Sequence, residues 1–147
     1  MRDGNLRTTF QKHLPDAHWQ AVETWGIAPG VPDAEFCFPG GYQGWIEFKV
    51  TKLSATTITA QQVAWLERRC RYGGRAFLAV RRKRNGVGAR AKLRCDELHL
   101  FDGTEAHAIL VGGIAGATPL GVWSGGAARW DWDAVRCFLT GSKNGRK

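Results

Sequence analysis

Several features of familiar protein classes are missing from this chain of 147 residues. No apolar run approaches the roughly 18 residues that a membrane-spanning helix needs. The first residues lead into polar sequence without the apolar stretch of a secretory signal peptide. The four cysteines lie far apart without a Cys-x-x-Cys pair, so they fit neither a zinc module nor a secreted disulfide framework. We therefore expect an intracellular, cytoplasmic protein with reduced cysteines and no membrane partner.

The overall composition is that of a folded, basic domain. Hydrophobic residues make up 44% of the chain, which is too many for a disordered polycation. The length corresponds to one ordinary domain, so we expect residues 1–147 to form a single domain with a basic tail at 141–147. The formal net charge of +8 suggests a polyanionic partner, most simply nucleic acid.

The charge is distributed unevenly along the chain. Residues 68–94 contain eleven Lys and Arg and no Asp or Glu. Residues 16–47 contain five carboxylates and neither Lys nor Arg. A protein that only binds polyanions has no need of the acidic segment. The two segments together therefore suggest that the protein cuts nucleic acid as well as binding it.

Apolar periodicity and turn residues predict alternating strands and helices. We expect strands at 18–25, 34–38, 44–50, 75–81, 96–101 and 121–124, helices at 8–13, 59–72 and 132–139, and a basic loop at 82–92. Either a helix or a strand fits residues 104–113. Pro39-Gly40-Gly41 predicts a hairpin turn, and Thr59 with Gln62 predicts a capping box at a helix start. This order of elements indicates an α/β sheet with at least one crossover helix.

Three charged residues have a spacing that suggests a site. Asp33 follows a rigid Val-Pro turn, and Glu47 comes fourteen residues later, with Lys49 two residues beyond it. Residues two apart on a strand point the same way, so Glu47 and Lys49 share a face. If the expected hairpin pairs, Asp33 lies at the open end of that face. The alternative is a surface Asp in a turn and an ion pair on an exposed strand face.

Two carboxylates beside one ammonium are costly to bury unless something compensates. A hard divalent cation, Mg²⁺ or Mn²⁺, fits such oxygen ligands with room for waters. The ion can bind a phosphate oxygen, lower the pKa of a bound water and stabilise the charge that develops on phosphorus. The ammonium of Lys49 can hold that water or help to neutralise the transition state. Together these groups suit phosphodiester hydrolysis.

The sequence also resembles a known family. The segments at 30–50 and 59–80 read GVPDAEFCFPGGYQGWIEFKV and TAQQVAWLERRCRYGGRAFLAV. Their Gly-Val-Pro-Asp, Glu-x-Lys, Gln at a helix start and Gly-Gly before an apolar strand together resemble the PD-(D/E)XK nuclease superfamily. The match is closest to the small VRR-NUC-type and Holliday-junction-resolvase-like members, many of them encoded by phages, and it covers about residues 18–84. It implies a restriction-endonuclease-like fold, with a mixed central β-sheet flanked by α-helices.

The resemblance implies roles for individual residues. Asp33 and Glu47 would be metal ligands together with the backbone carbonyl of Phe48, and Lys49 would be the catalytic lysine. Glu23 matches an upstream acid that many members place near the metal, so it would join the catalytic and metal-binding set. The alternative for Glu23 is a solvated strand acid.

The resemblance and the charge pattern extend the site beyond these carboxylates. Gln62 matches a Gln at the start of the following helix, close to the site in relatives, although it could be only a helix-start residue. Basic residues expected to contact DNA phosphates lie within the basic segment. They are Arg68, Arg81, Arg82, Lys83, Arg84, Arg90 and Lys92. Solvated, solubilising roles are the alternative for them.

The function expected from the resemblance is a Mg²⁺-dependent, structure-specific DNA endonuclease that leaves a 5′-phosphate and a 3′-hydroxyl. A branched substrate such as a Holliday junction is the first expectation, and it would require two active sites and hence a homodimer. A nuclease for flaps, forks or nicked duplex is the second. The alternative of another class is a catalytically silent nucleic-acid-binding protein on the same fold, which would be expected to lose Asp33, Glu47 or Lys49. All three residues are present.

Overall fold

The structure, a computed structural model, describes residues 5–24, 26–84 and 95–141. These residues form α-helices at Leu6–His13 (α1), Ala60–Arg71 (α2), Ala106–Gly112 (α3) and Trp132–Leu139 (α4). They form strands at His18–Ala21 (β1), Ala34–Phe38 (β2), Tyr42–Thr51 (β3), Ala76–Arg84 (β4), Cys95–Asp102 (β5) and Gly121–Trp123 (β6). Short 3₁₀ turns at Gly103–Glu105 (η2) and Ile114–Gly116 (η3) flank α3.

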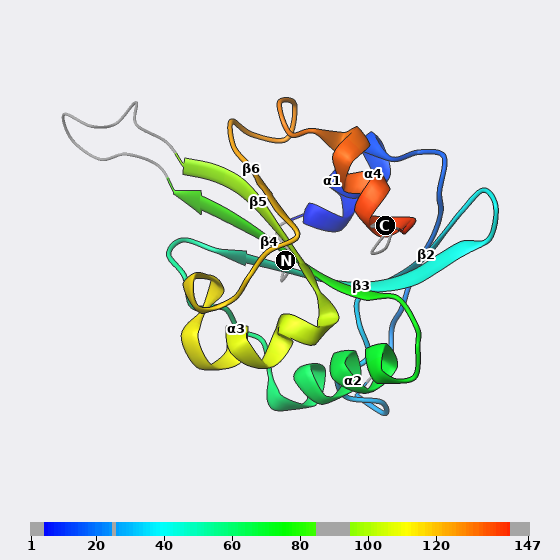
Figure 1. Cartoon of the computed structure of the whole chain (residues 1–147), viewed down its shortest axis with the longest axis vertical. Coiled ribbons are helices and arrows are strands. Elements are labelled where there is room, and N and C mark those ends of the chain that lie inside the picture. Colours follow the sequence, from blue (N-terminus) through cyan, green and yellow to red (C-terminus); the bar gives the residue numbers. More distant parts are fainter. Residues whose placement is uncertain (1–4, 25, 85–94, 142–147) are drawn as a thin grey trace.

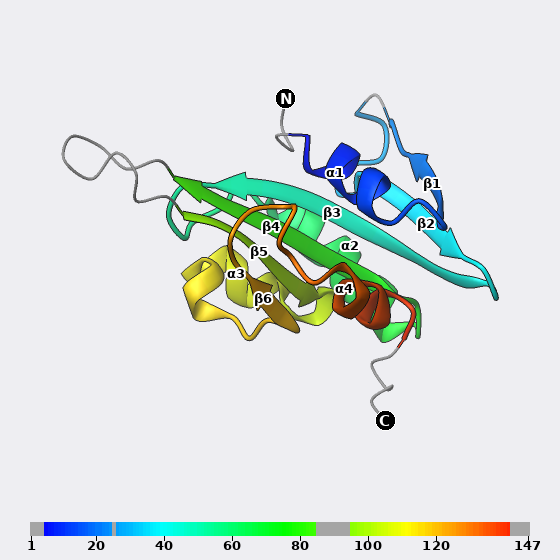
Figure 2. The same ribbon diagram turned by 90° about the horizontal axis from the view of Figure 1, so that it is seen from above.

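The strands of the described residues form one six-stranded mixed sheet in the order β1-β2-β3-β4-β5-β6. β3 and β4 are parallel and are joined through α2, while the other neighbouring pairs are antiparallel. β1 and β6 lie at opposite edges of the twisted layer (Figure 2). The expected α/β sheet with a crossover helix is therefore confirmed, and its assignment as a restriction-endonuclease-like fold stays a prediction.

Helices cover both faces of the sheet (Figure 1). α1 and α4 lie on one face, where Phe10, Phe36 and Phe48 belong to one buried cluster. α2 and α3 lie on the other face, where Leu66 and Leu78 belong to a second cluster. Both faces of the central strands are therefore covered, so any polar group on them has to find a partner within the protein.

Local signals explain how the two elements nearest the expected site form. Gly40 and Gly41 adopt φ of 99° and 83°, a region that favours glycine, and they let β2 turn directly into β3. At the start of α2, Thr59 Oγ1 accepts a hydrogen bond from the N–H of Gln62 at 3.1 Å. The side-chain oxygen of Gln62 accepts in return from the N–H of Thr59 at 3.0 Å. The hairpin turn and the capping box are thus both confirmed.

The structure corrects two expectations and decides a third that had been left open. β1 ends at Ala21, so a strand through residues 22–24 was wrong, and the chain leaves the sheet for a turn that is rich in Gly and Pro. β4 continues to Arg84, so the basic residues 82–84 belong to a strand and not to a loop. Residues 104–113, for which helix and strand both fitted, form η2 and then α3. The remainder of the expected loop, 85–92, lies outside the described residues, as does the tail from residue 142.

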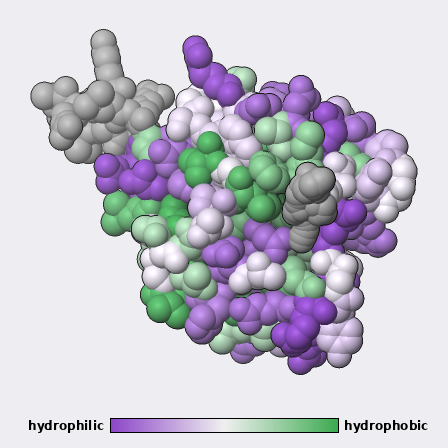
Figure 3. Space-filling view, viewed as in Figure 1, coloured by the Kyte–Doolittle hydropathy of each residue, from purple (hydrophilic) through white to green (hydrophobic). Residues whose placement is uncertain are grey.

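Apolar residues on the surface do not by themselves mark an interface. On the face shown in Figure 3, they form patches separated by hydrophilic residues. Large apolar residues with substantial exposure are Ile27, Tyr42, Leu53, Tyr72, Leu110, Val111 and Val122. Scattered exposure of this kind is ordinary in a folded domain, so the expected homodimer stays a prediction. In the part of the chain that is described, none of the helices has the length and apolar character needed to cross a bilayer.

Candidate active site

The site forms where β3 extends beyond the first residue of its antiparallel neighbour β2. Ala34 is the first residue of β2 and pairs with Ile46, whereas β3 continues to Thr51. Just beyond this pair, the N–H of Phe48 donates a hydrogen bond to Oδ2 of Asp33 at 2.9 Å. The hairpin thus places the carboxylate of Asp33 against the middle of β3.

Glu47 is the centre of a hydrogen-bonded group. Only 2% of the residue is exposed. Its Oε1 accepts from the N–H of Asp33 at 3.2 Å, and its Oε2 accepts from Nε2 of Gln62 at 2.9 Å. The same Oε2 lies 3.5 Å from Nζ of Lys49. We call Asp33, Glu47, Lys49 and Gln62 the acidic cluster.

The capping box of α2 orients Gln62 within this cluster. Because its side-chain oxygen accepts from the N–H of Thr59, its amide nitrogen is the end that can donate to Glu47. One side chain therefore completes the helix start and holds a buried carboxylate. This joins α2 to β3 at the site.

Lys49 is also buried, with 8% of the residue exposed. Its Nζ lies 3.4 Å from Oγ1 and 3.5 Å from the carbonyl oxygen of Thr57, in the segment between β3 and α2. These two acceptors and Glu47 hold the ammonium on the α2 side of the sheet, because Glu47 and Lys49 share one face of β3. The shared face expected for these two residues is confirmed.

The acidic cluster contains two carboxyl groups but only one cationic side chain. Burial, and next the nearby carboxylate of Asp33, raise the pKa of Glu47 to about 8, although the ammonium of Lys49 acts in the opposite direction. Lys49 therefore compensates for only part of the cost of two carboxylates. A strongly raised carboxyl pKa in a cavity is a recognised mark of functional sites.

A cavity of about 440 Å³ opens onto the cluster. Asp33, Glu47, Lys49 and Gln62 all line it, as does the backbone segment around Phe48. Glu23 lines the same cavity from the segment after β1, but no hydrogen bond joins it to the acidic cluster among the described residues. The structure thus brings five expected residues to one cavity and joins four of them by direct contacts, Asp33 through its backbone N–H.

The donor set fits a hard divalent cation. Asp33 and Glu47 offer carboxylate oxygens, and a cation beside them would remove the need for a proton on Glu47. The N–H of Phe48 points to Asp33, and the C=O of a strand residue points to the same side as its N–H, so this carbonyl is available as a third oxygen. Within the described residues, no group of three His, Cys, Asp or Glu converges as a metal site, so this carbonyl and waters would have to complete the coordination.

Those basic residues expected to bind DNA that the structure describes do not form one surface. In β4, Arg81 and Arg82 point to opposite faces of the sheet because consecutive strand residues alternate. Arg81 donates to both carboxylate oxygens of Asp96 at 2.8 Å. Arg82 donates to the carbonyl of Leu53 at 2.7 Å and lies 3.5 Å from Oε1 of Glu97.

The other expected DNA contacts differ in their exposure. Lys83 and Arg84 are exposed at the end of β4, and Arg68 is exposed on α2. Arg90 and Lys92 lie outside the described residues. The basic segment is thus divided between paired strand arginines and exposed residues on two separate elements.

Two residues at the site were not expected from the sequence. Arg7 of α1 lines the cavity, and Thr57 holds Lys49. Arg7 carries no local signal, because α1 reaches the cavity only through its packing against the sheet. Thr57 stands eight residues after Lys49, in a segment without periodicity, so its contact depends on how the chain returns from β3 to α2.

Comparison with known proteins adds no relative, since no protein-family model, curated protein or solved structure matches the chain. The geometry of the cavity therefore has to carry the functional argument.

Proposed function

We propose that the protein is a metal-dependent nuclease that hydrolyses phosphodiester bonds at the acidic cluster. The observation that carries the proposal is the hydrogen-bonded group of Asp33, Glu47, Lys49 and Gln62 at the base of a cavity. Its excess of carboxyl groups over cationic side chains and its oxygen donors suit Mg²⁺ or Mn²⁺. The resemblance to PD-(D/E)XK nucleases leads to the same proposal from the order of these residues in the chain.

Each residue has a task in this proposal. Asp33, Glu47 and the carbonyl of Phe48 would hold the ion, which supplies a water of lowered pKa and neutralises charge on the phosphate. Gln62 fixes the rotamer of Glu47 through its hydrogen bond. The ammonium of Lys49 lies beside Glu47 and can donate a hydrogen bond that orients the attacking water.

The peripheral charges of the cavity also have a place in the proposal. Arg7 is positioned on the cavity wall, where a guanidinium can contact a phosphate oxygen of the bound strand. Glu23 also lines the cavity and would act through water, or through an ion held by the acidic cluster. The net charge of +8 favours a nucleic acid over a small phosphate ester as the substrate.

The substrate proposed is DNA. A four-way junction is the first candidate and would be cut by a homodimer with two active sites. A flap, fork or nicked duplex is the second. The direct test is a cleavage panel at equal salt, with four-way junction, fork, flap, duplex and single strand, in Mg²⁺ and in EDTA.

The variants in this test are Asp33→Ala and Glu47→Ala, with Glu35→Ala as the matched control. Glu35 is a β2 carboxylate two residues from Asp33, and it hydrogen-bonds to Gln43 outside the cavity. We expect both site variants to lose Mg²⁺-dependent cleavage while still binding DNA, and the control to cut normally. Undiminished cleavage by both site variants would refute the site. DNA binding by the unsubstituted protein without cleavage in any metal would support the silent nucleic-acid-binding alternative.

A further inference from the structure

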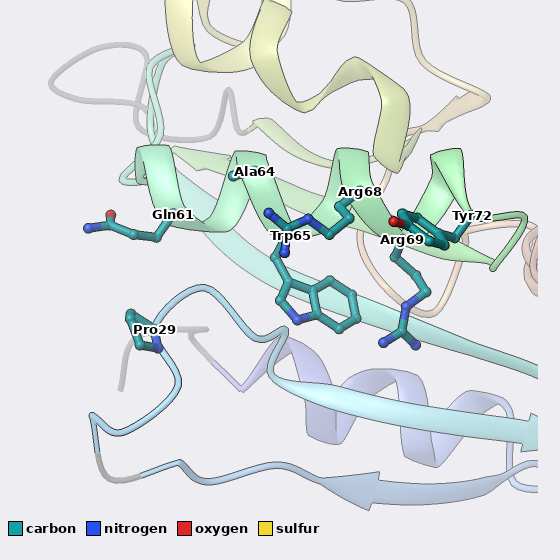
Figure 4. A pocket seen from close by; sticks show the side chains of 7 residues that line it. All are labelled: Pro29, Gln61, Ala64, Trp65, Arg68, Arg69 and Tyr72. Atoms are coloured by element: carbon teal, nitrogen blue, oxygen red, sulfur yellow. The ribbon is translucent and has the colours of Figure 1, made fainter.

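A second cavity runs along the outer face of α2 (Figure 4). It has a volume of about 530 Å³. Six of its lining residues come from the helix and its C-terminal cap, at a spacing that keeps them on one face. They are Gln61, Ala64, Trp65, Arg68, Arg69 and Tyr72. We call this face, together with Pro29 opposite its first turn, the α2 groove.

Planar side chains dominate the α2 groove. The guanidinium of Arg69 lies over the ring of Trp65, 4.5 Å from its centroid, and also 5.4 Å from the ring centroid of Trp45. Tyr72 is 81% exposed at the far end of the groove. In Figure 4, Trp65 and Arg69 extend from the helix on the side where Pro29 lies. Such faces stack well with the flat surface of a nucleobase.

The groove is also positively charged. Arg68 and Arg69 line it, and no carboxylate does so among the residues the structure describes. A guanidinium can contact a phosphate with two parallel hydrogen bonds, so alternating Arg and aromatic residues can hold a backbone and its bases together. Charge therefore favours a nucleic acid over an uncharged or cationic partner.

The groove adjoins the candidate active site. Pro29 lines both cavities. Gln61 lines the groove, while its neighbour Gln62 reaches Glu47 in the acidic cluster. Gly30 packs directly against the first turn of α2, since a Cβ there would lie 2.4 Å from the carbonyl oxygen of Gln61. The two cavities lie on either side of this contact, so a strand that passes from the acidic cluster over Pro29 would reach the groove.

We propose that the α2 groove binds an unpaired nucleic-acid strand, with a base stacked at Tyr72 and a phosphate at Arg68. This inference rests on the proposed nuclease function, because it names the substrate class of that site as one with unpaired bases next to the scissile bond. A continuous duplex does not suit the groove, because its base faces are already stacked within the helix. A flap, a fork or an opened junction presents such a strand.

The test measures binding of the full-length protein in EDTA, by fluorescence anisotropy, so that no cleavage contributes. The probes are a labelled oligothymidylate and an abasic oligomer of the same length and charge. We expect the oligothymidylate to bind at least about 5-fold more tightly, the lower end of what one base stacked on an aromatic side chain contributes. Tyr72→Ala should remove this preference, and Tyr72→Phe should retain it. Tyr72 is so exposed that neither change threatens the fold.

Arg68→Ala tests the phosphate contact against a matched control. Arg71 is an exposed arginine of the same helix that does not line the groove. Arg68→Ala should weaken binding of both oligomers and reduce the slope of log K against log salt by about 0.7, the value for one contact on a single strand. Arg71→Ala should leave that slope within error.

The possible outcomes separate this inference from the proposed function. Equal binding of the two oligomers, or an unchanged preference in Tyr72→Ala, overturns the inference even if DNA is cut at Asp33 and Glu47. A Tyr72-dependent preference for bases in a protein that cuts nothing supports strand binding in the groove and overturns the nuclease instead. A weaker response to Arg68→Ala than to Arg71→Ala overturns the assignment of the phosphate contact.

Discussion

Two groups of charged side chains, one around β3 and one between β4 and β5, differ in how their charges are balanced. The acidic cluster has two carboxyl groups and a single ammonium, that of Lys49, which pairs with Glu47. Between β4 and β5, each carboxylate has a partner of its own. Arg81 pairs with Asp96, and Glu97 pairs with both Arg82 and His99. We call these five residues the paired cluster.

The difference is visible in two glutamates. Burial, with the neighbouring Asp33, raises the pKa of Glu47 to about 8. The hydrogen bond from His99 lowers the pKa of Glu97, with help from the charges of His99 and Arg82. The fold thus stabilises the ionised form of Glu97 and the protonated form of Glu47. A balanced pair can serve structure alone, whereas carboxyl groups without enough cationic partners are what the proposed metal site would need.

The largest contrast that we predict is in cleavage. Glu47→Gln keeps the shape and hydrogen-bonding ends of the side chain but removes the charge, so we expect cleavage in Mg²⁺ to fall by more than about 100-fold. Loss of groups that only support metal ligands already costs roughly 10- to 100-fold. Glu97→Gln makes the same chemical change in the paired cluster and should cut at nearly the normal rate. Single-turnover cleavage of the best substrate in the panel measures both, and equal losses in the two variants would remove the distinction between the clusters.

The second contrast is the pH dependence of stability in metal-free buffer. The folded protein keeps a proton on Glu47 that the unfolded chain releases, so this residue makes the free energy of unfolding fall as pH rises from about 4.5 to about 8. Glu97 acts in the opposite direction. Its lowered pKa contributes stability that is present above its ordinary pKa, 4.5, and is lost as pH falls through the value in the folded protein.

Urea unfolding at a series of pH values in EDTA measures both effects. Glu47→Gln should flatten the curve between about pH 4.5 and 8, with a gain in stability at the alkaline end. Glu97→Gln should instead flatten the acidic limb. If Glu47→Gln lowers stability equally at all pH values, the Glu47 carboxyl is ionised in the folded protein and its neighbours fully compensate its charge. The acidic cluster then lacks no positive charge.

The acidic cluster could be predicted from the sequence because its members are connected by local rules. The Gly40-Gly41 turn sets the pairing of Ala34 with Ile46, and that register alone places Asp33 beside Glu47. The capping box likewise follows from Thr59 and Gln62, three residues apart. The hairpin turn and the helix start allow the chain few conformations, so residues with this spacing in the sequence lie close together in the fold.

The paired cluster could not be predicted in the same way. The basic residues at 82–84 carry no apolar alternation, so the pattern indicated that a loop starts at 82. The structure extends β4 through them because β5 pairs with the strand as far as Arg84 and supplies carboxylates, with Asp96 bonded to Arg81 and Glu97 opposite Arg82. That register depends on contacts between β4 and β5 that no local motif encodes. The α2 groove depends on distant contacts for a related reason, since its wall opposite the helix is Pro29, which lies about thirty residues before the helix and which no local pattern places there.

The smallest predicted effect tests whether ion pairing decides which basic residues of β4 bind DNA. Lys83 and Arg84 are exposed, and no ion pair involves them among the described residues, so their charges are free to meet phosphate. We expect Lys83→Gln with Arg84→Gln to weaken duplex binding a few-fold and to lower the slope of log K against log salt by up to about 1.8, the value for two contacts. Arg81→Gln, whose charge is already engaged by Asp96, should leave the slope unchanged while destabilising the fold. The reverse result would mean that the paired cluster opens to bind DNA, and that ion pairing in the free protein does not distinguish structural from binding residues on β4.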